Sequence, residues 1–482
     1  MQSGMEFRHP RRFARTISVS IAEAWDIPAT RQRLVPPSPP RAPEGMTAFE
    51  RLAAMRISAI GTWGQRAYED DIIRGSFFFL RSSFILNTPD AIRHVLVDNY
   101  ENYSRTPAGL RVLRPMLGEG LLIAEGRAWK HQRRTLAPAF TPRAVATLVP
   151  HMVAVTDDTI ANLRNAAATG GPVDLRGIMQ RMTLEIAGRT MFSFGMERHG
   201  ATLRDFVMEY AERLARPHFF DLVLPVNWPA PRDLARARFR KRWTQFVGML
   251  MAERRAAGKQ EGAPARDLFD LMNAARDPET GEAFSEAQLG DQVATMILAG
   301  HETTATALFW ALYLLALDPV AQEQLAGEAR QVSASAEADL DRLKFTRAVV
   351  DETMRLYPPA FLIARSANGP DVIAGIPVKK HDVILIAPWL LHRHEKLWRD
   401  PNAFVPERFL PPSPPDRFAY LPFGVGARVC IGAHFALVEA TLALARFIAA
   451  FRVELLEKDP VMPHGVVTTQ PDRSPMFKIT PR

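Results

Sequence analysis

Cysteine is almost absent from this chain of 482 residues, which contains a single one, Cys430. A single cysteine excludes intramolecular disulfides and every zinc or iron–sulfur site that needs several thiolates. Long apolar runs are missing too: none approaches the roughly 18 residues of a membrane-spanning helix, so no transmembrane segment is expected. The protein is predicted to be soluble and cytoplasmic, and its lone thiol is either a small buried side chain or a functional ligand.

Acidic residues are outnumbered by basic ones, 52 to 60, which gives a formal net charge of +8. A basic balance is compatible with a nucleic acid, an anionic membrane surface or an acidic protein partner, and does not choose among them. Residues 235–243 (ARARFRKRW) are a basic helix start, for which a solvated helix face is a simpler explanation than a nucleic-acid patch. Because no recognised nucleic-acid motif is present, no nucleic-acid partner is expected.

The first 45 residues differ in composition from the rest of the chain. Residues 1–34 are rich in arginine and poor in acids, which is compatible with an organelle transit peptide, although we favour a flexible extension or an over-extended start. Residues 35–45 (VPPSPPRAPEG) are typical of a stiff, extended connector. We expect a basic arm and connector over residues 1–45 and one folded domain over residues 46–482.

Apolar periodicity predicts a mainly α-helical fold with small β-sheets. The segments 76–80 and 84–87 are typical of a short hairpin. Residues 100–120 show no clean period and contain several prolines and glycines, so they are predicted to form a long loop. Further helices are expected over residues 346–357 and directly after Cys430.

The longest helix is predicted to begin at Ser285 and to end at Leu317. The sequence SEAQ at 285–288 is a capping box, which pairs the N-cap serine with the glutamine three positions later. Asp318 and Pro319 then end the helix. Because this helix is apolar on nearly every side, it is expected to be buried at the centre of the fold.

Cys430 lies within the segment FGVGARVCIG, residues 423–432. By average residue usage, its phenylalanine, glycines, arginine and cysteine would occur at these spacings by chance with odds on the order of 10⁻⁴. Gly426 and Gly432 let the backbone turn and approach closely. Backbone N–H groups and the N-terminus of the following helix can keep a thiolate ionised in an apolar pocket.

The segment resembles the haem-binding loop of the cytochrome P450 family at every fixed position. The resemblance implies a haem b cofactor (iron protoporphyrin IX), with Cys430 as the metal ligand, and the P450 fold, in which haem lies between the long central helix and the Cys430 loop. A thiolate ligand pushes electron density to the iron and favours O–O cleavage. In the family, the positions of Phe423, Gly424 and Gly432 border the cofactor, and Arg428 is placed to pair with a haem propionate.

Within the long helix, the sequence AGHETT at 299–304 resembles the oxygen-activation motif of the same family. The small residues Ala299 and Gly300 would let the helix backbone come close to the iron. Glu302 and Thr303 form an acid–alcohol pair, which suits the delivery of protons to bound oxygen. Alone, such threonines usually bond only to the carbonyls of their own helix. Together with the cysteine loop, the motif predicts that Thr303 and Glu302 are catalytic.

Two further motifs have a structural role in the family. The sequence ETMR at 352–355 puts Glu352 and Arg355 on one helix face, and PERF at 406–409 contributes Arg408. A pair spaced in this way is common by chance and is usually a surface pair of little energetic value. The resemblance instead implies that these three residues form a buried charge triad beneath the haem loop.

The resemblance also assigns residues to the haem propionates. The sequence WKHQR at 129–133 puts Trp129 and Arg133 on one helix face, and both positions contact a propionate in the family. Arg365 matches a further propionate-binding position. Without the resemblance, a core tryptophan beside a solvated arginine would explain the first motif. His392 is expected to be a local structural hydrogen-bonding residue.

The implied activity is a monooxygenase reaction, RH + O₂ + two electrons + two protons giving ROH and water. No flavin or iron–sulfur module is visible in the chain, so a separate ferredoxin or flavodoxin, with its NAD(P)H-dependent reductase, is expected to supply the electrons to a monomeric enzyme. An acidic partner of this kind would be attracted to a basic face. The pocket residues expected by correspondence are apolar, which predicts a lipophilic small-molecule substrate. They are Phe219, Phe220, Phe361, Leu362, Ile363, Val466 and Val467.

Three other functions remain open at this stage. A peroxide-using enzyme or a haem-thiolate isomerase would have less need of the Glu302–Thr303 pair. A non-catalytic haem sensor would not need a proton relay at all. A nucleic-acid binder is indicated only by the positive charge and by residues 235–243.

Overall fold

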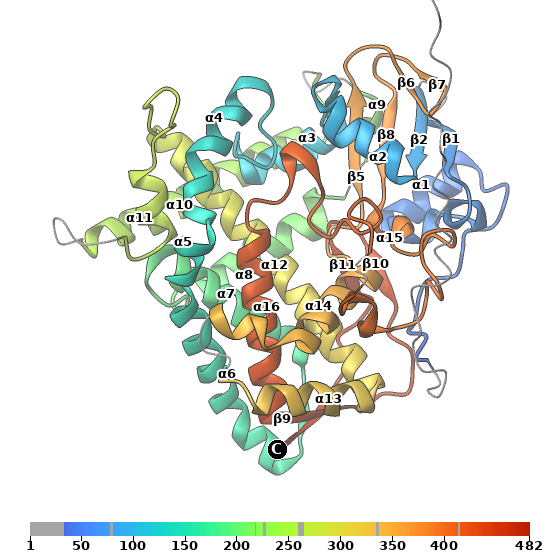
Figure 1. The fold of residues 1–482 in the computed structure, drawn as a ribbon. Helices are drawn as coiled ribbons and strands as arrows, with labels where there is room; N and C mark the ends of the chain where they lie inside the picture. The colour runs from blue at the N-terminus through green and yellow to red at the C-terminus, as the bar shows by residue number, and fades with distance from the viewer. Residues whose placement is uncertain are drawn as a thin grey trace, which may run out of the picture. The chain divides into compact units, whose positions relative to one another are not determined.

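Helix α12 (Glu286–Leu317) runs through the middle of the fold (Figure 1). The Ser285 hydroxyl accepts a hydrogen bond from the Gln288 N–H at 3.3 Å, and the Gln288 side chain accepts one from the Ser285 N–H at 2.8 Å. The predicted capping box is therefore confirmed. Asp318 follows the helix and caps α13 (Pro319–Arg330), as the sequence predicts for the end of the long helix.

This computed structural model describes residues 33–482 apart from 78–80, 217, 225–227, 259–264, 334–336 and 413–414. Residues 33–482 belong to one compact unit, which is mainly helical with small sheets, as predicted. The predicted basic arm lies outside the described residues, except for its last two positions.

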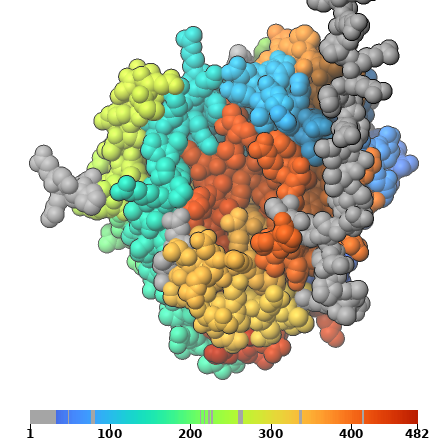
Figure 2. Space-filling view, viewed as in Figure 1, coloured from blue at the N-terminus to red at the C-terminus, as the bar shows by residue number. Residues whose placement is uncertain are grey.

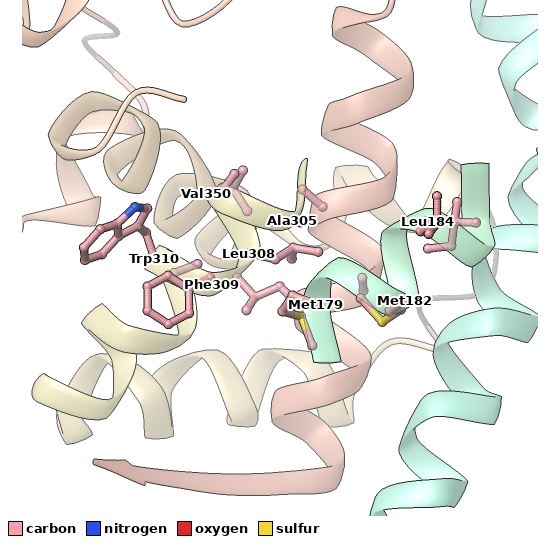
Figure 3. Packing of buried hydrophobic residues seen from close by; sticks show 14 of the residues in the cluster. Met179, Met182, Leu184, Ala305, Leu308, Phe309, Trp310 and Val350 are labelled. Atoms are coloured by element: carbon pink, nitrogen blue, oxygen red, sulfur yellow. The ribbon is translucent and has the colours of Figure 1, made fainter. Parts of the chain in front are cut away.

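The helices that pack most extensively against α12 are α7 (Leu175–Phe192), α14 (Lys344–Leu356) and α16 (Ala433–Ala450). Figure 3 shows Met179 and Met182 of α7 against Leu308 and Phe309 of α12. The helix α14 covers the predicted helix 346–357, and α16 is the predicted helix after Cys430. A central helix covered on several sides explains why α12 is apolar nearly all round.

The remaining helices surround this central group or connect it to the sheets (Figure 1). They are α1 (Ala48–Ile57), α2 (Pro89–Arg93), α3 (Pro107–Leu117), α4 (Gly126–Leu136), α5 (Pro142–Ala146), α6 (Val149–Thr169), α8 (Gly200–Glu209), α9 (Phe219–Val223), α10 (Asp233–Ala256), α11 (Leu268–Ala274) and α15 (Pro388–Leu391).

One helix among the described residues, α16, is long and apolar enough to cross a membrane by length and composition. Its mean hydropathy is 1.5, and 56% of it is buried inside the fold. The pair α12 and α13 passes the same test together but is bent by 116°. Because α16 lies against α12 in the core, packing accounts for its apolar composition. Polar and charged residues, among them Glu439 and Arg446, interrupt its apolar sequence, so no span was predicted there.

The largest sheet has five strands in the order β1-β2-β8-β5-β3. Strand β1 (Ile72–Phe77) pairs antiparallel with β2 (Arg81–Leu86), as the predicted hairpin requires, although β1 begins earlier than predicted and residues 78–80 lie outside the described residues. The sheet continues through β8 (Val383–Ile386), which is parallel to β2, and then β5 (Ile363–Ala367) and β3 (Tyr103–Ser104).

The smaller sheets contain two or three strands each. The strand β12 (Phe477–Pro481) pairs with β4 (Pro172–Val173) and β9 (Phe451–Leu455). Two antiparallel pairs complete the strands described here: β6 (Asp371–Ile373) with β7 (Ile376–Val378), and β10 (Pro463–Gly465) with β11 (Thr469–Pro471).

The predicted loop over residues 100–120 is wrong, because most of this segment forms helix α3. The Thr106 hydroxyl accepts a hydrogen bond from the Gly109 N–H at 3.2 Å, and Pro107 occupies the first turn, where its missing N–H costs nothing. Val112 and Met116 are buried on one helix face. The internal proline and the glycine hid this amphipathic pattern in the sequence.

Residues 33–45, part of the predicted connector, make specific contacts with the folded body. The Ala42 N–H donates to the Trp63 carbonyl at 2.9 Å, and the Tyr357 hydroxyl donates to the Pro37 carbonyl at 2.7 Å. The boundary at residue 46 stays a prediction.

Candidate functional site

The loop before α16 is closed by backbone hydrogen bonds. The Cys430 N–H donates to the Phe423 carbonyl at 2.9 Å, and the Val429 N–H donates to Gly426 at 3.1 Å. Gly426 has a φ of +78°, and a Cβ there would lie 2.2 Å from the Leu96 carbonyl oxygen. Only glycine fits this close approach, so the loop needs Gly426 to present Cys430 at its end.

The Cys430 sulfur is accessible to solvent, yet burial is the largest influence on the pKa of its thiol, which it raises. Both observations hold if the sulfur faces an internal recess rather than the outer surface. The Gly432 N–H bonds the sulfur, and the Arg133 guanidinium adds positive charge; both lower the thiol pKa and so favour the thiolate. Arg133 is held in place by donating to the Val429 carbonyl at 2.9 Å.

The segment around the sulfur is unusually open for its position in the fold. Residues 422–437 include no fully buried residue, although α16 lies in the core beside α12. On α12, Ala299 is exposed while Ile297 and His301, two positions away on either side, are buried. A recess bordered by apolar groups and a thiolate is what a haem requires.

Three arginines gather around one carboxylate near this loop. Arg428 pairs with Glu125 and donates to the Ala124 carbonyl at 3.0 Å, while Arg105 pairs with Glu125 at 3.2 Å. Burial, with the charges of Arg105 and Arg428, lowers the pKa of the third arginine, Arg365, to about 9. Burial and Arg105 likewise lower the pKa of Arg428 to about 10. Three guanidinium groups against one carboxylate leave two positive charges, which the two propionates of a haem would balance.

The helix α4 contributes both residues of the WKHQR motif, but at different points of the site. The Arg428 guanidinium lies 4.5 Å from the centre of the buried Trp129 ring, so Trp129 belongs to the arginine cluster. Arg133, one helical turn later, lies at the cysteine loop instead, where it donates to the Val429 carbonyl and its charge acts on the Cys430 thiol. Their proposed contacts with a propionate stay predictions.

Glu302 and Thr303 point in different directions from α12. The Thr303 hydroxyl donates to the Ala299 carbonyl at 2.7 Å. The Glu302 carboxylate accepts from the Thr468 hydroxyl at 3.2 Å and from the Gln470 amide at 3.1 Å. Neighbouring residues on a helix are separated by about 100°, so the acid and the alcohol are adjacent in sequence but not in direct contact.

Comparison with known proteins accounts for this combination of loop, helix and arginines. Residues 36–476 match the cytochrome P450 family. The chain belongs to the cytochrome P450 family. It is 32% identical over 422 residues to protein LUTEIN DEFICIENT 5, chloroplastic, of Arabidopsis thaliana, covering 82% of this chain and 70% of that protein. It is also 32% identical over 386 residues to cyclooctatin synthase of Streptomyces melanosporofaciens, covering 78% and 81%.

A human relative, cytochrome P450 3A7, is 31% identical over 388 residues, which cover 76% of this chain and 76% of that protein. Membership of the family makes the chain an oxidoreductase of the monooxygenase class with a haem-thiolate cofactor. The predicted family, fold class and enzyme class are confirmed.

The P450 scaffold joins α14 to the segment that follows α15 through buried charges. Glu352 and Arg355 are both fully buried and 2.6 Å apart, and Arg408 lies 3.5 Å from the same glutamate. Arg355 also donates to three backbone carbonyls, those of His392, Pro401 and Ala403. Glu352, Arg355 and Arg408 therefore form a buried tie, a group of contacts that joins segments far apart in the sequence.

His392 links this tie to the cysteine loop. Its Nε2 accepts a hydrogen bond from the Leu421 N–H at 2.8 Å, and Nδ1 lies 3.3 Å from the Arg355 carbonyl, to which it donates. These contacts select one neutral tautomer. Burial, with the charges of Arg355 and Arg393, lowers the pKa of His392 to about 3.

The predicted pocket residues come from three regions. Phe361 is buried, and a Cβ at Gly465 would lie 3.2 Å from its ring, which places the β10–β11 hairpin beside it. Val467 at the turn of this hairpin is 39% exposed, while Val466 is half-buried. Ile363 lies near Gly424 of the cysteine loop, and Leu362 is half-buried beside it.

Phe219 and Phe220 on α9 are each 40% exposed, with ring centres 5.6 Å apart. Helix α9 packs on α3, the helix that the sequence did not predict.

Sequence reasoning missed four residues of this site: Arg105, Glu125, Thr468 and Gln470. Glu125 directly precedes the WKHQR helix, and this was the available signal. The other three lie in segments without a motif, and only the folded chain brings them to the site.

Removal of Arg355 should be costly. Arg355→Ala leaves Glu352 buried without its main partner, so the free energy of unfolding should fall by about 3–5 kcal/mol. Arg347→Ala on the same helix is the control, since Arg347 is 42% exposed and its pair with Asp351 should contribute less than about 1 kcal/mol. Urea unfolding followed by circular dichroism measures both, and equal losses would contradict a special role for the buried tie.

His392 should make the free energy of unfolding depend on pH. Since its pKa is about 3 in the folded protein and 6.5 in the reference state, its neutral form contributes stability above pH 6.5 that is lost as the pH falls toward 3. The slope should reach about 1.4 kcal/mol per pH unit. His392→Gln keeps a donor and an acceptor but does not titrate, so unfolding at several pH values should show a shallower slope; an unchanged slope would count against this assignment.

Proposed function

We propose that this P450 uses haem b to insert one oxygen atom from O₂ into a lipophilic small molecule, with electrons from a separate ferredoxin or flavodoxin and its NAD(P)H-dependent reductase. The observation that carries the proposal is the setting of Cys430, whose thiolate is favoured by Gly432 and Arg133 beside a cluster with excess positive charge. Because Cys430 is the only cysteine, it is the only residue that can supply the thiolate of a P450.

The cofactor would be held from both sides. Cys430 would ligate the iron, with Phe423, Gly424 and Gly432 around the sulfur and Ala299 on the opposite helix. The propionates would be held by Arg428, Arg365, Trp129 and Arg133, and we include Arg105 in this set because it shares Glu125 with Arg428. When bound, haem supplies the electron transfer and oxygen activation that the family is known for.

The residues of α12 would manage protons. Thr303 holds a proton on Oγ1 at the exposed stretch around Ala299, and Glu302 is the nearest acid along the helix. A hydroxyl that donates to bound oxygen and a carboxylate that replaces its proton would favour oxygen insertion over release of peroxide. A peroxide-using enzyme, an isomerase or a haem sensor would have less use for this pair.

The substrate class is proposed from the pocket and from relatives. The pocket residues, Phe361, Leu362, Ile363, Val466, Val467, Phe219 and Phe220, are all apolar. One relative is named cyclooctat-9-en-7-ol 5-monooxygenase and another carotene epsilon-monooxygenase, names that denote apolar molecules. We therefore propose a hydrocarbon-rich substrate.

The electron donor is proposed to dock beside α4. Arg133 ties this helix to the cysteine loop, and Arg127 and Lys130 lie exposed on its outer side. Figure 2 shows the orange-to-red part of the chain at the centre of the visible face, next to the cyan part. An acidic partner would be attracted to such a face. The proposal includes one haem-binding domain over residues 46–482, preceded by an arm and connector, in a soluble, cytoplasmic monomer.

Thiolate ligation is the first point to test. The carbon monoxide difference spectrum of the dithionite-reduced protein should show the strongly red-shifted Soret band of thiolate ligation, and Cys430→Ser should lack it. Folded protein grown with adequate haem but without any haem spectrum would overturn the proposal.

Thr303→Ala should keep haem but release more of the supplied electrons as peroxide, by about threefold or more, because the proton donor is lost. The measurement compares peroxide formed with NADPH consumed, using a ferredoxin and its reductase. Thr304→Ala, which removes a hydroxyl bonded to Gly300 in the same helix, serves as the control. Unchanged coupling in the Thr303 variant would remove this residue from its proposed role.

Reduction by ferredoxin should slow as salt rises, by about threefold between low and physiological ionic strength, because the proposed attraction is electrostatic. Stopped-flow measurement of haem reduction provides the rate. Arg127→Gln should weaken the salt dependence, whereas Arg56→Gln, an exposed arginine on α1, should not. A flat salt response of the wild-type protein would argue against electrostatic docking.

A further inference from the structure

Side chains from outside the motifs recognised in the sequence hold the Glu302 carboxylate in place. Thr468 and Gln470, which lie at the β10–β11 turn and on β11, both donate to its Oε1 atom, at 3.2 and 3.1 Å. The Gln470 amide nitrogen also lies 2.9 Å from the Thr306 hydroxyl and 2.8 Å from the Thr468 hydroxyl. The carboxylate is therefore fixed against the hairpin, on the side of α12 that faces β11.

Arg176 decides which way the Gln470 amide points. Its guanidinium donates to the Gln470 Oε1 atom at 3.2 Å. Because arginine has no acceptor, the amide oxygen must face Arg176, and the amide nitrogen must face Glu302. The Thr306 hydroxyl donates to the Glu302 backbone carbonyl at 2.8 Å, which leaves its oxygen to accept from Gln470. The order of donors runs from Arg176 through Gln470 to Glu302.

The outer end of this chain of contacts approaches solvent. Arg176 lies in the first turn of α7, is half-buried, and reaches the exposed Ser474 hydroxyl at 3.5 Å. A shallow, open depression in the surface lies beside it. Its lining residues are Arg176, Gln180, Ala305, Thr306, Phe309 and Gln470. Burial lowers the pKa of Arg176, while the charges of Asp174 and Glu302 act in the opposite direction.

We propose that Gln470, oriented by Arg176 and assisted by Thr468, is the positioning residue that holds the Glu302 carboxylate for its proposed role in proton delivery. This rests on the proposed function in one respect, since it requires Glu302 to act in proton delivery. If these contacts only joined α7 to β11, their loss would lower the stability of the protein but would not change the proton-dependent steps of turnover.

The test uses the haem-loaded enzyme with NADPH, a ferredoxin, its reductase and O₂, and no added organic substrate. NADPH oxidation and peroxide release are measured in H₂O and D₂O across a range of pH. Gln470→Leu should slow NADPH oxidation by about threefold or more and increase the solvent isotope effect, because Glu302 loses its tether. The carbon monoxide spectrum should not change. Gln180→Leu, the same chemical change in the same depression, should match the wild type.

A double-mutant cycle separates positioning from simple structural support. In a Glu302→Gln background, Gln470→Leu should change the rate by less than about 1.5-fold, since both changes act through one carboxylate. Arg176→Lys keeps a donor for Gln470 and should stay near the wild type, whereas Arg176→Met should behave like Gln470→Leu. If Gln470→Leu does not fold, the variants Arg176→Lys and Arg176→Met still test the proposal.

Two outcomes overturn the proposal, and they are distinguishable. If Glu302→Gln impairs turnover but Gln470→Leu and Arg176→Met do not, or if Gln470→Leu has the same effect with and without Glu302, the positioning role fails alone. If Glu302→Gln itself leaves the rate and the isotope effect unchanged, the proton role of Glu302 in the proposed function fails, and the positioning role fails with it.

Discussion

The thiol of Cys430, which burial makes harder to ionise, constrains much of this fold. Burial raises its pKa, so any compensation has to come from groups next to the cysteine loop. The Gly432 N–H and the Arg133 guanidinium supply it, and both need the loop to keep one shape. The close approach of Gly426 to Leu96 keeps that shape, at a position where any side chain would collide.

The buried residues Glu352 and Arg355 support the same loop indirectly. Arg355 reaches three backbone carbonyls while paired with Glu352, and His392 connects that group to Leu421, just before the loop. Because His392 is neutral, it donates one hydrogen bond, to the Arg355 carbonyl, and accepts one, from the Leu421 N–H. The arginine cluster around Glu125 has the opposite character, because its positive charge exceeds what the nearby protein neutralises. The first group is balanced within the chain, whereas the second keeps excess positive charge, which is the basis for proposing that it holds an anionic cofactor.

The sequence predicted the parts of this site whose chemistry is local. The capping box at Ser285, the end of the long helix and the cysteine loop depend on neighbouring residues. The first two could be recognised from spacing, and the loop from its resemblance to the family's haem-binding loop. Helix α3 was missed because Pro107 and Pro115 are usually signs of a break, whereas here one occupies the first turn. Arg105 and Gln470 could not be predicted, since they reach the site only when distant segments pack together. The direction of the Glu302 side chain was beyond the sequence for the same reason.

The placement of the only cysteine within the fold also has a practical consequence. Under the proposed ligation, iron would hold the Cys430 sulfur, and a cysteine introduced on the surface would be the single thiol free to react with a spin label or a fluorophore. No background cysteines would have to be removed first, because the sequence contains one cysteine. A paramagnetic ferric iron would then give each labelled position a distance to a fixed internal reference. Motions of α3, α9 and the β10–β11 hairpin can thus be followed one site at a time.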